Sequence, residues 1–343
     1  MTAAPTADAA QPLPAVVSER AAAGGVRASV DEQRLALRAA TMYHLDGATQ
    51  AQIATRLGVS RPTAGRLVAR ARAWGLVRIE VTVPLELRGS VHADLEQQLE
   101  RIFGLDEAMV VSRNVDDGDP GYLGVGRGAA SVLARRLQPG YTVGFTWGPE
   151  TVAVARALPA RARRCARVVQ LDGGMTTADF QTGADYVLSQ CADRLQASPL
   201  RLLAPLYADP ATVTALERDS GVSRALRAGR EAEVMFFGLG PVGAATTLFE
   251  GSFLDEEVLA EVSALGAAGE IGGRFFDADG ADVGGSMPAR TVSVGLDAVR
   301  ACPVSILVSG GRRKHTSIRA ALRGGLATVL VTDMHSAQVL VNG

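Results

Sequence analysis

Seven short apolar runs, separated by longer segments with helical periodicity, follow one another from about residue 105 to the end of the chain. The runs read EAMVVS, YTVGFT, ARVVQL, RLLAPL, EVMFFGLG, PVSILVSGG and ATVLVTD. Strands that are covered on both faces are apolar throughout, and parallel strands need a crossover helix between them. The alternation therefore predicts an α/β domain over residues 105–343, in which helices flank a doubly wound, mostly parallel sheet.

The sequence before this domain has a different pattern, which predicts a winged helix-turn-helix over residues 31–84. Residues 31–45 are expected to form a helix, and Thr49 is expected to cap a short second helix, QAQIATRL. After the turn GVS, Ser60 caps a third and longer helix. The alternating segment WGLVRIEVTVP then predicts a wing strand that stops at Pro84.

Basic residues are concentrated in this region, although the formal net charge of the whole chain is only −1. Residues 31–90 contain nine arginines and five acidic residues, and between Ser60 and Ile79 there are five arginines and no acid. A local excess of positive charge suits a polyanionic partner. The partner that this pattern predicts is double-stranded operator DNA.

The third helix is expected to enter the major groove of that DNA. The candidate DNA-binding residues open the second and third helices, lie on the exposed side of the third, or, for the last of them, lie in the predicted wing strand: Thr49, Gln50, Ser60, Arg61, Thr63, Arg66, Arg70, Arg72 and Arg78. Among them Arg61, Thr63 and Arg66 are expected near base edges, whereas the later arginines are better placed for phosphates. The alternative is a three-helix packing module with a solvated basic face.

The remaining segments limit the class of protein. The first 28 residues are rich in Ala, Pro and Gly and predict a disordered tail, and residues 85–104 predict a helix that links the two domains. No apolar run reaches the roughly 18 residues of a membrane span. Three widely spaced cysteines indicate a reducing compartment, so we expect a cytoplasmic protein. No metal-ligand spacing occurs, and no cofactor is predicted.

Glycine-bearing segments follow four of the predicted strands, and ligands of open parallel sheets bind beyond the carboxyl ends of strands. In GFTWGPET, free N–H groups and hydroxyls can hold a phosphate, and an indole can stack on a sugar face. The residues concerned are Thr146, Trp147, Gly148 and Thr151. In LDGG and GLGPV, glycines let the backbone approach a ligand: Gly173, Gly174, Gly238 and Gly240. The alternatives are a core role for Trp147 and ordinary turns for the glycines.

The chain contains a single lysine, Lys314, and it follows the strand end Gly310-Gly311. A compact ammonium near a helix N-terminus adds to the attraction of the helix dipole for phosphate. A Schiff base to a sugar aldehyde is a less favoured role, and a surface lysine without function is the third alternative. Glu270 and Asp277, in GEIGGRFFDADG, are candidate acceptors for sugar hydroxyls.

The chain resembles the SorC-type family of bacterial sugar-binding transcriptional regulators over residues 31–343. The resemblance rests on TQAQIATRLGVSRPTAGRLVARARAWGLVRIEV, GFTWGPET, VVQLDGG, FFGLGPV, GAAGEIGGRFFDADG and VSGGRRKHTSIRAALRGGLATVLVTD, taken in this order. It implies a C-terminal domain similar to the ribose-5-phosphate isomerase and glucosamine-6-phosphate deaminase fold. It also implies a phosphorylated sugar as effector, assembly into dimers or tetramers, and control of a carbohydrate catabolic operon.

Two other functions are alternatives to a sugar-binding transcriptional regulator. A sugar-phosphate isomerase or deaminase of the related fold would need a poised carboxylate with a partner, and Asp172 is the only acid at an obvious strand end. A nucleotide-binding protein is disfavoured because GYLGVGRGAA lacks the spacing of the dinucleotide fingerprint. We therefore expect a DNA-binding regulator and not an enzyme.

Overall fold

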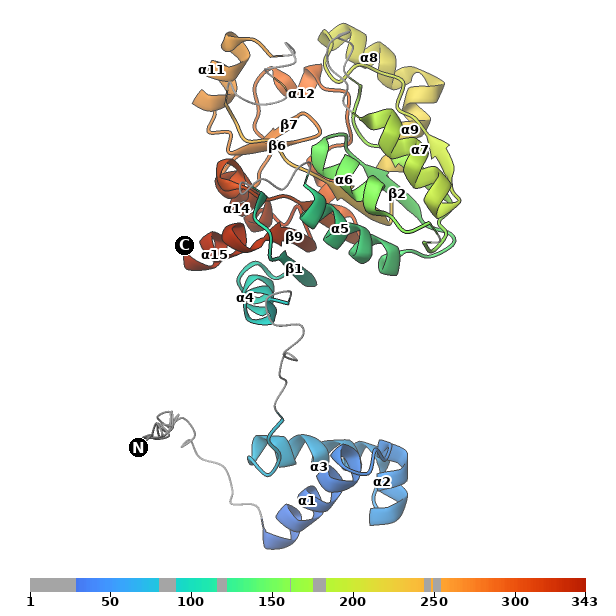
Figure 1. Ribbon diagram of the computed structural model, residues 1–343, viewed down its shortest axis with the longest axis vertical. Coiled ribbons are helices and arrows are strands. Elements are labelled where there is room, and N and C mark those ends of the chain that lie inside the picture. The colour runs from blue at the N-terminus through green and yellow to red at the C-terminus, as the bar shows by residue number, and fades with distance from the viewer. Residues whose placement is uncertain are drawn as a thin grey trace, which may run out of the picture. The chain divides into compact units, whose positions relative to one another are not determined.

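The computed structural model describes residues 29–79, 91–115, 122–160, 162–174, 183–243, 248 and 254–343. The chain forms two compact units, Met1–Thr82 and Val83–Gly343, which we describe separately (Figure 1). Within the described residues, none of the helices combines the length and the apolar character that crossing a bilayer requires.

The first unit is a helix-turn-helix built from three helices: α1 (Val30–His44), α2 (Gln50–Leu57) and α3 (Arg61–Ala73). The predicted caps are confirmed. The Thr49 side chain accepts a hydrogen bond from Gln52 N in a capping box, and the Ser60 side chain accepts one from Thr63 N. Gly58 ends α2 at φ 66°, a left-handed conformation that glycine adopts without strain. Residues 74–79 of the predicted wing strand are not in a strand, and residues 80–84 lie outside the described residues.

The second unit contains a seven-stranded parallel sheet, as the apolar runs predict (Figure 1). Its spatial order is β1-β9-β8-β5-β2-β3-β4. The strands are β1 (Glu107–Val111), β2 (Thr142–Phe145), β3 (Arg167–Gln170), β4 (Ser198–Leu200), β5 (Val234–Phe237), β8 (Val304–Val308) and β9 (Val329–Asp333). The prediction of a strand at RLLAPL is wrong, because the edge strand β4 ends before it. That run includes Pro205, which has no N–H to donate, and Leu203, which is 75% exposed.

Helices cover both faces of this sheet, because side chains alternate between the faces along each strand. In β5, Val234 and Phe236 pack into the core layer beneath α5, α6 and α7, whereas Met235 and Phe237 pack toward α9, α13, α14 and α15. These helices are α5 (Leu123–Arg136), α6 (Pro149–Ala157), α7 (Ala184–Leu195), α9 (Ser220–Arg230), α13 (Leu296–Ala301), α14 (His315–Arg323) and α15 (Met334–Asn342).

A smaller lobe lies beside the carboxyl edge of the sheet. Its core joins Leu248 and Phe275 with residues of the surrounding helices. The lobe consists of the antiparallel pair β6 (Gly269–Ile271) and β7 (Arg274–Phe276) with α11 (Glu256–Ala264) and α12 (Met287–Arg290), and α8 (Pro210–Arg218) packs against α12. The lobe therefore supplies a second wall above the strand ends.

Helix α4 (Ala93–Phe103) begins the described part of the second unit and packs along the edge strand β1. Leu99 is fully buried, whereas Ile102 is 52% exposed. The Glu96 and Glu100 carboxylates accept hydrogen bonds from Val110 N and Ala108 N, each at 3.0 Å. The outer N–H groups of the edge strand are thus bonded to α4, which ties this helix to the sheet.

Candidate functional site

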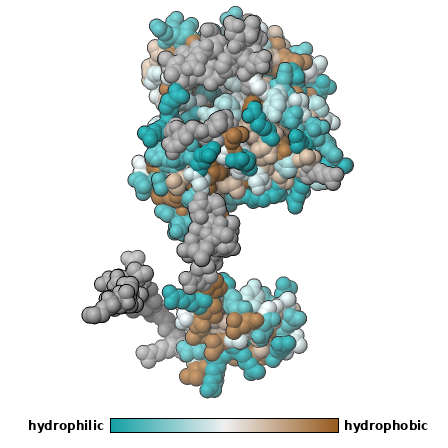
Figure 2. Space-filling view, in the orientation of Figure 1, coloured by the Kyte–Doolittle hydropathy of each residue, from teal (hydrophilic) through white to brown (hydrophobic). Residues whose placement is uncertain are grey.

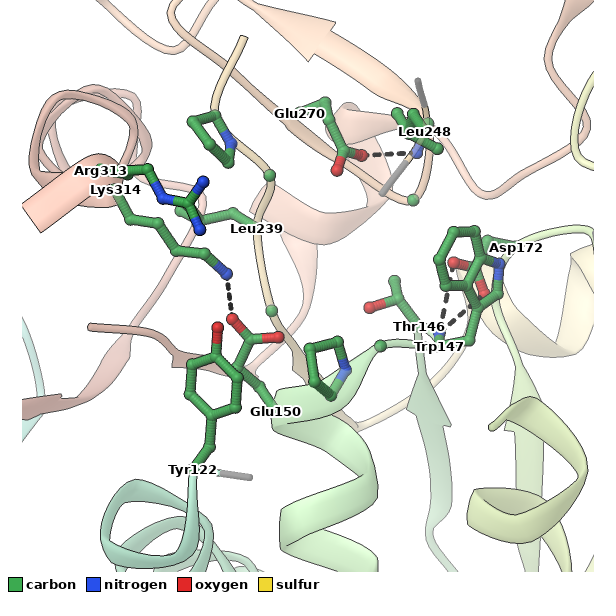
Figure 3. Close-up of a pocket in the computed structure, with 17 residues that line it drawn as sticks. Tyr122, Thr146, Trp147, Glu150, Asp172, Leu239, Leu248, Glu270, Arg313 and Lys314 are labelled. Atoms are coloured by element: carbon green, nitrogen blue, oxygen red, sulfur yellow. Dashed lines mark hydrogen bonds and ion pairs between the residues drawn. The ribbon is translucent and has the colours of Figure 1, made fainter. Parts of the chain in front are cut away.

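A cavity of about 160 Å³ lies at the carboxyl edge of the sheet, where β2 and β5 are neighbours. From this point the chain runs outward to β3 and β4 on one side and to β8 and β9 on the other, so the cavity lies at the topological switch point of the sheet. It is lined by Tyr122, Thr146, Trp147, Gly148, Pro149, Glu150, Asp172, Gly238, Leu239, Gly240, Pro241, Leu248, Glu270, Gly272, Gly273, Arg313 and Lys314 (Figure 3).

Lys314 forms an ion pair with Glu150 across this cavity (Figure 3). Lys314 follows β8, and Glu150 lies in the first turn of α6 after β2. Their side chains are 15% and 3% exposed, so the pair is largely withdrawn from solvent. The Lys314 ammonium also lies 5.5 Å from the ring centroid of Tyr122, within reach of a cation–π interaction.

The ammonium stays charged in this position. Burial alone would lower the pKa of Lys314, but the Glu150 carboxylate, followed by Tyr122 and Glu270, outweighs burial and raises that pKa above its ordinary value. The Lys314 ammonium is therefore charged at neutral pH, and the Glu150 carboxyl group is its bonded partner.

Two further carboxyl groups face the cavity from its other walls. Glu270, on β6, accepts a hydrogen bond from Gly273 N at 2.9 Å, and Asp172, after β3, accepts from Trp147 N at 3.2 Å. Burial raises the pKa of both groups. Repulsion by Glu270 adds to the increase for Asp172, whereas for Glu270 the hydrogen bond from Gly273 N, followed by the Lys314 charge, partly offsets it. Two carboxyls that share one site in this way ionise less readily than exposed ones.

Glycines after β5 make room for these acids. A Cβ atom on Gly238 would lie 2.9 Å from Glu150 Oε2, and one on Gly240 would collide with Glu270 Oε1. Because β5 lies between β8 and β2, its glycines sit between the elements that carry Lys314 and Glu150. The sequence predicts that the backbone at these glycines approaches a ligand closely. In the structure it lies close to the Glu150 and Glu270 side chains.

Of the residues predicted to bind an effector, seven line the cavity: Thr146, Trp147, Gly148, Gly238, Gly240, Glu270 and Lys314. The Trp147 indole Nε1 donates to Gly173 O at 2.9 Å, and its ring packs beside the core of the small lobe. The indole is thus anchored at one end and lines the cavity as well.

The other predicted residues do not line it: Thr151, Gly173, Gly174, Asp277, Gly310 and Gly311. The buried Thr151 hydroxyl donates to Gly148 O. The Asp277 carboxylate accepts hydrogen bonds from Asp279 N and Ala281 N in the turn after β7. Gly311 N donates to Asp333 Oδ2, which fixes the Gly310-Gly311 segment just before Lys314. Gly173 and Gly174 bond to Val292 O and Ala204 O through their N–H groups.

Sequence reasoning did not identify Glu150, Tyr122 or Arg313 as residues of this site. Glu150 lies inside the quoted motif GFTWGPET, but its role depends on the position of Lys314, which is 164 residues away. Tyr122 carries a more local signal, because it has φ 58° and begins α5, a conformation that is uncommon for a tyrosine.

The charge of the cavity differs from what the predicted role of Lys314 in phosphate binding implies. In the part of the chain that the structure describes, its lining carries three carboxyl groups, on Glu150, Asp172 and Glu270, and two cationic groups, on Arg313 and Lys314. Arg313 is exposed, so the buried part of the lining is dominated by acids. Among the described residues, no set of three His, Cys, Asp or Glu side chains is arranged to hold a metal ion.

The helix-turn-helix unit presents the predicted basic surface on α3. Arg61, Arg66 and Arg72 are exposed on this helix, and Arg78 is exposed after it. Thr63 is partly buried, and its hydroxyl lies 2.8 Å from Ser60 Oγ and accepts from Arg66 Nη2 at 3.2 Å. The N-terminal end of α3 is therefore locally ordered before any partner binds.

Two other predicted DNA-binding residues have partners within the unit. Arg70 pairs with Glu32 of α1 at 3.3 Å and lies 5.9 Å from the Trp74 ring centroid. Both side chains of that ion pair are about half exposed, and such surface pairs are weak enough to open. The Gln50 side chain packs against Gly65, where a Cβ would lie 3.2 Å from Gln50 Oε1, so it helps to join α2 to α3.

Comparison with known families agrees with both units. Residues 89–342 match the family described as "Putative sugar-binding domain", and residues 39–84 match the MarR family. The first match begins just before α4 and covers the whole sheet unit. The second spans the last part of α1, α2 and α3.

Relatives and solved structures narrow the family. The deoxyribonucleoside regulator of Bacillus subtilis is 33% identical over 317 residues, which cover 91% of this chain and 98% of that protein. The full-length crystal structure of the sorbitol operon regulator SorC from Klebsiella pneumoniae has a TM-score of 0.67 at 28% identity, covering 91% of this chain and 99% of that one. The chain belongs to the SorC-type family of sugar-binding transcriptional regulators. This regulator is also 30% identical to LsrR of Escherichia coli K12, over 90% of its length and 95% of LsrR.

Proposed function

We propose that this SorC-type regulator binds an operator through α2 and α3 and adjusts that binding in response to a sugar effector in the cavity of the sheet unit. The observation that carries the proposal is the cavity itself. Buried carboxyl groups, an indole and a lysine converge at the switch point of the sheet, where polar groups can fix the hydroxyls of a sugar.

The names of the relatives support an operon of carbohydrate catabolism as the target. One relative is named for deoxyribonucleosides, another for the sorbitol operon, and a third for erythritol catabolism. Because these compounds differ, the names support a sugar-related effector as a class. Which compound this regulator binds depends on its own cavity. A phosphorylated sugar remains the prediction from the sequence, based on Lys314 and the N-terminus of α6.

We propose no catalytic activity for the cavity. Each carboxyl group in it already has a partner, since Glu150 pairs with Lys314, Asp172 with Trp147 N, and Glu270 with Gly273 N. No histidine belongs to the lining drawn from the described residues, so a group to open a sugar ring is not apparent there. Failure of the purified protein to convert ribose 5-phosphate or glucosamine 6-phosphate is the expected result.

We further propose that the regulator acts as a homo-oligomer, a dimer or tetramer, in the cytoplasm, where its DNA target is. Support comes from hydrophobic surface on the helix-turn-helix unit, part of which is visible in Figure 2. Val30 and Leu45, at the two ends of α1, are 67% and 80% exposed, and Leu37 is 49% exposed. Side chains of this kind are suited to a contact with another copy. Light scattering at micromolar concentration gives the mass directly.

A thermal-shift screen of sugars, alditols and their phosphates tests the proposal. A ligand that binds only the folded protein raises the melting temperature by mass action. We expect one class of compound to stabilise the regulator, and we expect the increase to disappear in Glu270→Ala, which removes a carboxyl group from the cavity wall. Equal stabilisation of Glu270→Ala would contradict the placement of the effector.

A further inference from the structure

Lys314 is not available to a phosphate in the way that the sequence alone suggests. Its ammonium is already bonded to Glu150, and the Glu150 side chain is only 3% exposed. A phosphate that approached Lys314 would meet this carboxylate at contact distance. Two negative groups in a site withdrawn from water repel each other strongly, because little solvent screens them.

The Glu150 carboxylate is also built firmly into its position. It faces Gly238, where a Cβ would lie 2.9 Å from Oε2, and Gly148, where a Cβ would lie 3.7 Å from the same atom. Glu150 belongs to the first turn of α6, where the helix dipole favours a negative group. The carboxylate therefore occupies the place, between a helix N-terminus and a lysine, that an effector phosphate would otherwise take.

The rest of the wall is suited to hydroxyl groups. Glu270 and Asp172 present carboxyl oxygens, which accept hydrogen bonds from hydroxyls and can also donate when protonated. Their burial favours the protonated form. The remaining cationic group in the described lining is Arg313, which is exposed and extends beside Lys314 in Figure 3. Within the described lining, a buried dianion would thus face the carboxyl groups of Glu150, Asp172 and Glu270, while Lys314 is already paired and Arg313 lies at the solvent side.

We infer that the effector of this regulator is an uncharged sugar or polyol and that Glu150 excludes phosphate esters from the cavity. The inference rests on the proposed function, and it departs from the phosphorylated sugar that the sequence and the family resemblance predict. The selectivity is of the repulsive kind, in which a fixed charge disfavours the wrong ligand.

The first experiment needs no knowledge of the effector and uses inorganic phosphate and sulfate as probes. The full-length chain and Glu150→Gln are compared by calorimetric titration. Glutamine keeps the shape of the side chain but leaves Lys314 with an unbalanced charge. We expect Glu150→Gln to bind sulfate at least about tenfold more tightly than the wild type, and the double variant Glu150→Gln/Lys314→Gln to lose this gain.

Glu231→Gln, an exposed glutamate at the end of α9, is the matched control for the change in net charge and for general salt effects. The inference is overturned if Glu150→Gln and Glu231→Gln bind the anions equally. It is also overturned if the wild-type protein binds inorganic phosphate through Lys314, so the test stands even where Glu150→Gln does not fold.

The second experiment compares four- to six-carbon sugars and alditols with their own phosphate esters, by stabilisation of the wild-type regulator and by change in operator affinity. We expect the uncharged member of a pair to be effective and its ester to be at least about tenfold weaker. A stronger response to the ester, or to an amino sugar, overturns the inference. The proposed function, a regulator that responds to a sugar, would still hold in that case. If no member changes operator affinity, the proposed function itself fails.

Discussion

Lys314 and Glu150 act as one unit at the scale of single residues, because burial makes each dependent on the other. Removal of one partner from a buried ion pair leaves an uncompensated charge, which is far more costly than neutralising both. A single substitution and the double substitution of this pair therefore have to be compared before any loss of effector response is assigned to lost ligand contacts.

Lys314→Gln is expected to lower the free energy of unfolding of the sheet unit by roughly 3 kcal/mol, and Glu150→Gln/Lys314→Gln to recover most of that loss. Urea denaturation followed by Trp147 fluorescence measures both. The only other tryptophan, Trp74, is in the helix-turn-helix unit, so a Trp74→Phe background isolates the signal. Strictly additive effects of the two changes would contradict a coupled pair.

Asp172 gives the regulator a pH dependence whose sign follows from burial. Burial raises the pKa of Asp172 well above its ordinary 3.8 in the folded state, so above pH 3.8 this carboxyl group holds its proton more firmly in the native protein than in the unfolded chain. Its stability therefore falls as pH rises toward and through the raised pKa. Asp172→Asn should flatten this decline at pH values above 3.8, the ordinary pKa of the group, while its amide oxygen still accepts from Trp147 N. Melting curves across that range measure it, and an unchanged slope would show that Asp172 is not the source.

At the scale of elements, α4 is held by the sheet edge through two carboxylates. Glu96 and Glu100 bond to the N–H groups of Val110 and Ala108 in β1. Because these are hydrogen bonds to charged acceptors, each should contribute more than a neutral one. A displacement of β1 is thus expected to carry α4 with it.

Replacing Glu96 or Glu100 by leucine should raise the amide exchange rate of Val110 or Ala108 by about fivefold or more, since the bond that protects each N–H is lost. Glutamine at the same positions keeps an acceptor oxygen and serves as the control, with a smaller increase. Exchange measured by NMR or mass spectrometry decides between them. Equal exchange in the leucine variants and the wild type would show that these bonds do not hold α4.

Helix α3 provides the prediction for DNA. Arg66→Ala should weaken binding to a selected operator by roughly 1–3 kcal/mol and relax sequence preference, because a contact to a base edge is lost. Arg72→Ala should weaken all sequences alike and reduce the salt slope by about one unit. Anisotropy titrations at several salt concentrations separate the two. If Arg66→Ala binds with unchanged affinity and preference, α3 does not read bases through this residue.

Much of the fold could be predicted from local sequence, since caps, turns and strand patterns involve neighbouring residues. The caps at Thr49 and Ser60 and six of the seven apolar runs agree with the structure. The error at RLLAPL arose because an apolar run beside an edge strand looks like a buried strand. The role of Glu150 was missed for another reason, because it depends on the adjacency of β8, β5 and β2.

At the scale of the whole molecule, the regulator has to connect a cavity in one unit with a DNA-binding helix in the other. Any such connection is a coupling free energy between two binding events, and it is reciprocal. An effector that weakens operator binding must itself bind more weakly to the operator complex, by the same factor.

Control of DNA binding by the cavity is tested by measuring the operator affinity of the full-length regulator with and without the effector found by the sugar screen, on duplex DNA that the protein itself selects from a random pool. We expect the effector to change operator affinity by roughly 5- to 150-fold, which is typical of allosteric coupling. Glu270→Ala should abolish this change and Glu231→Gln should retain it. An effector that stabilises the protein but leaves operator affinity unchanged, or a full response in Glu270→Ala, would contradict control of DNA binding by the cavity.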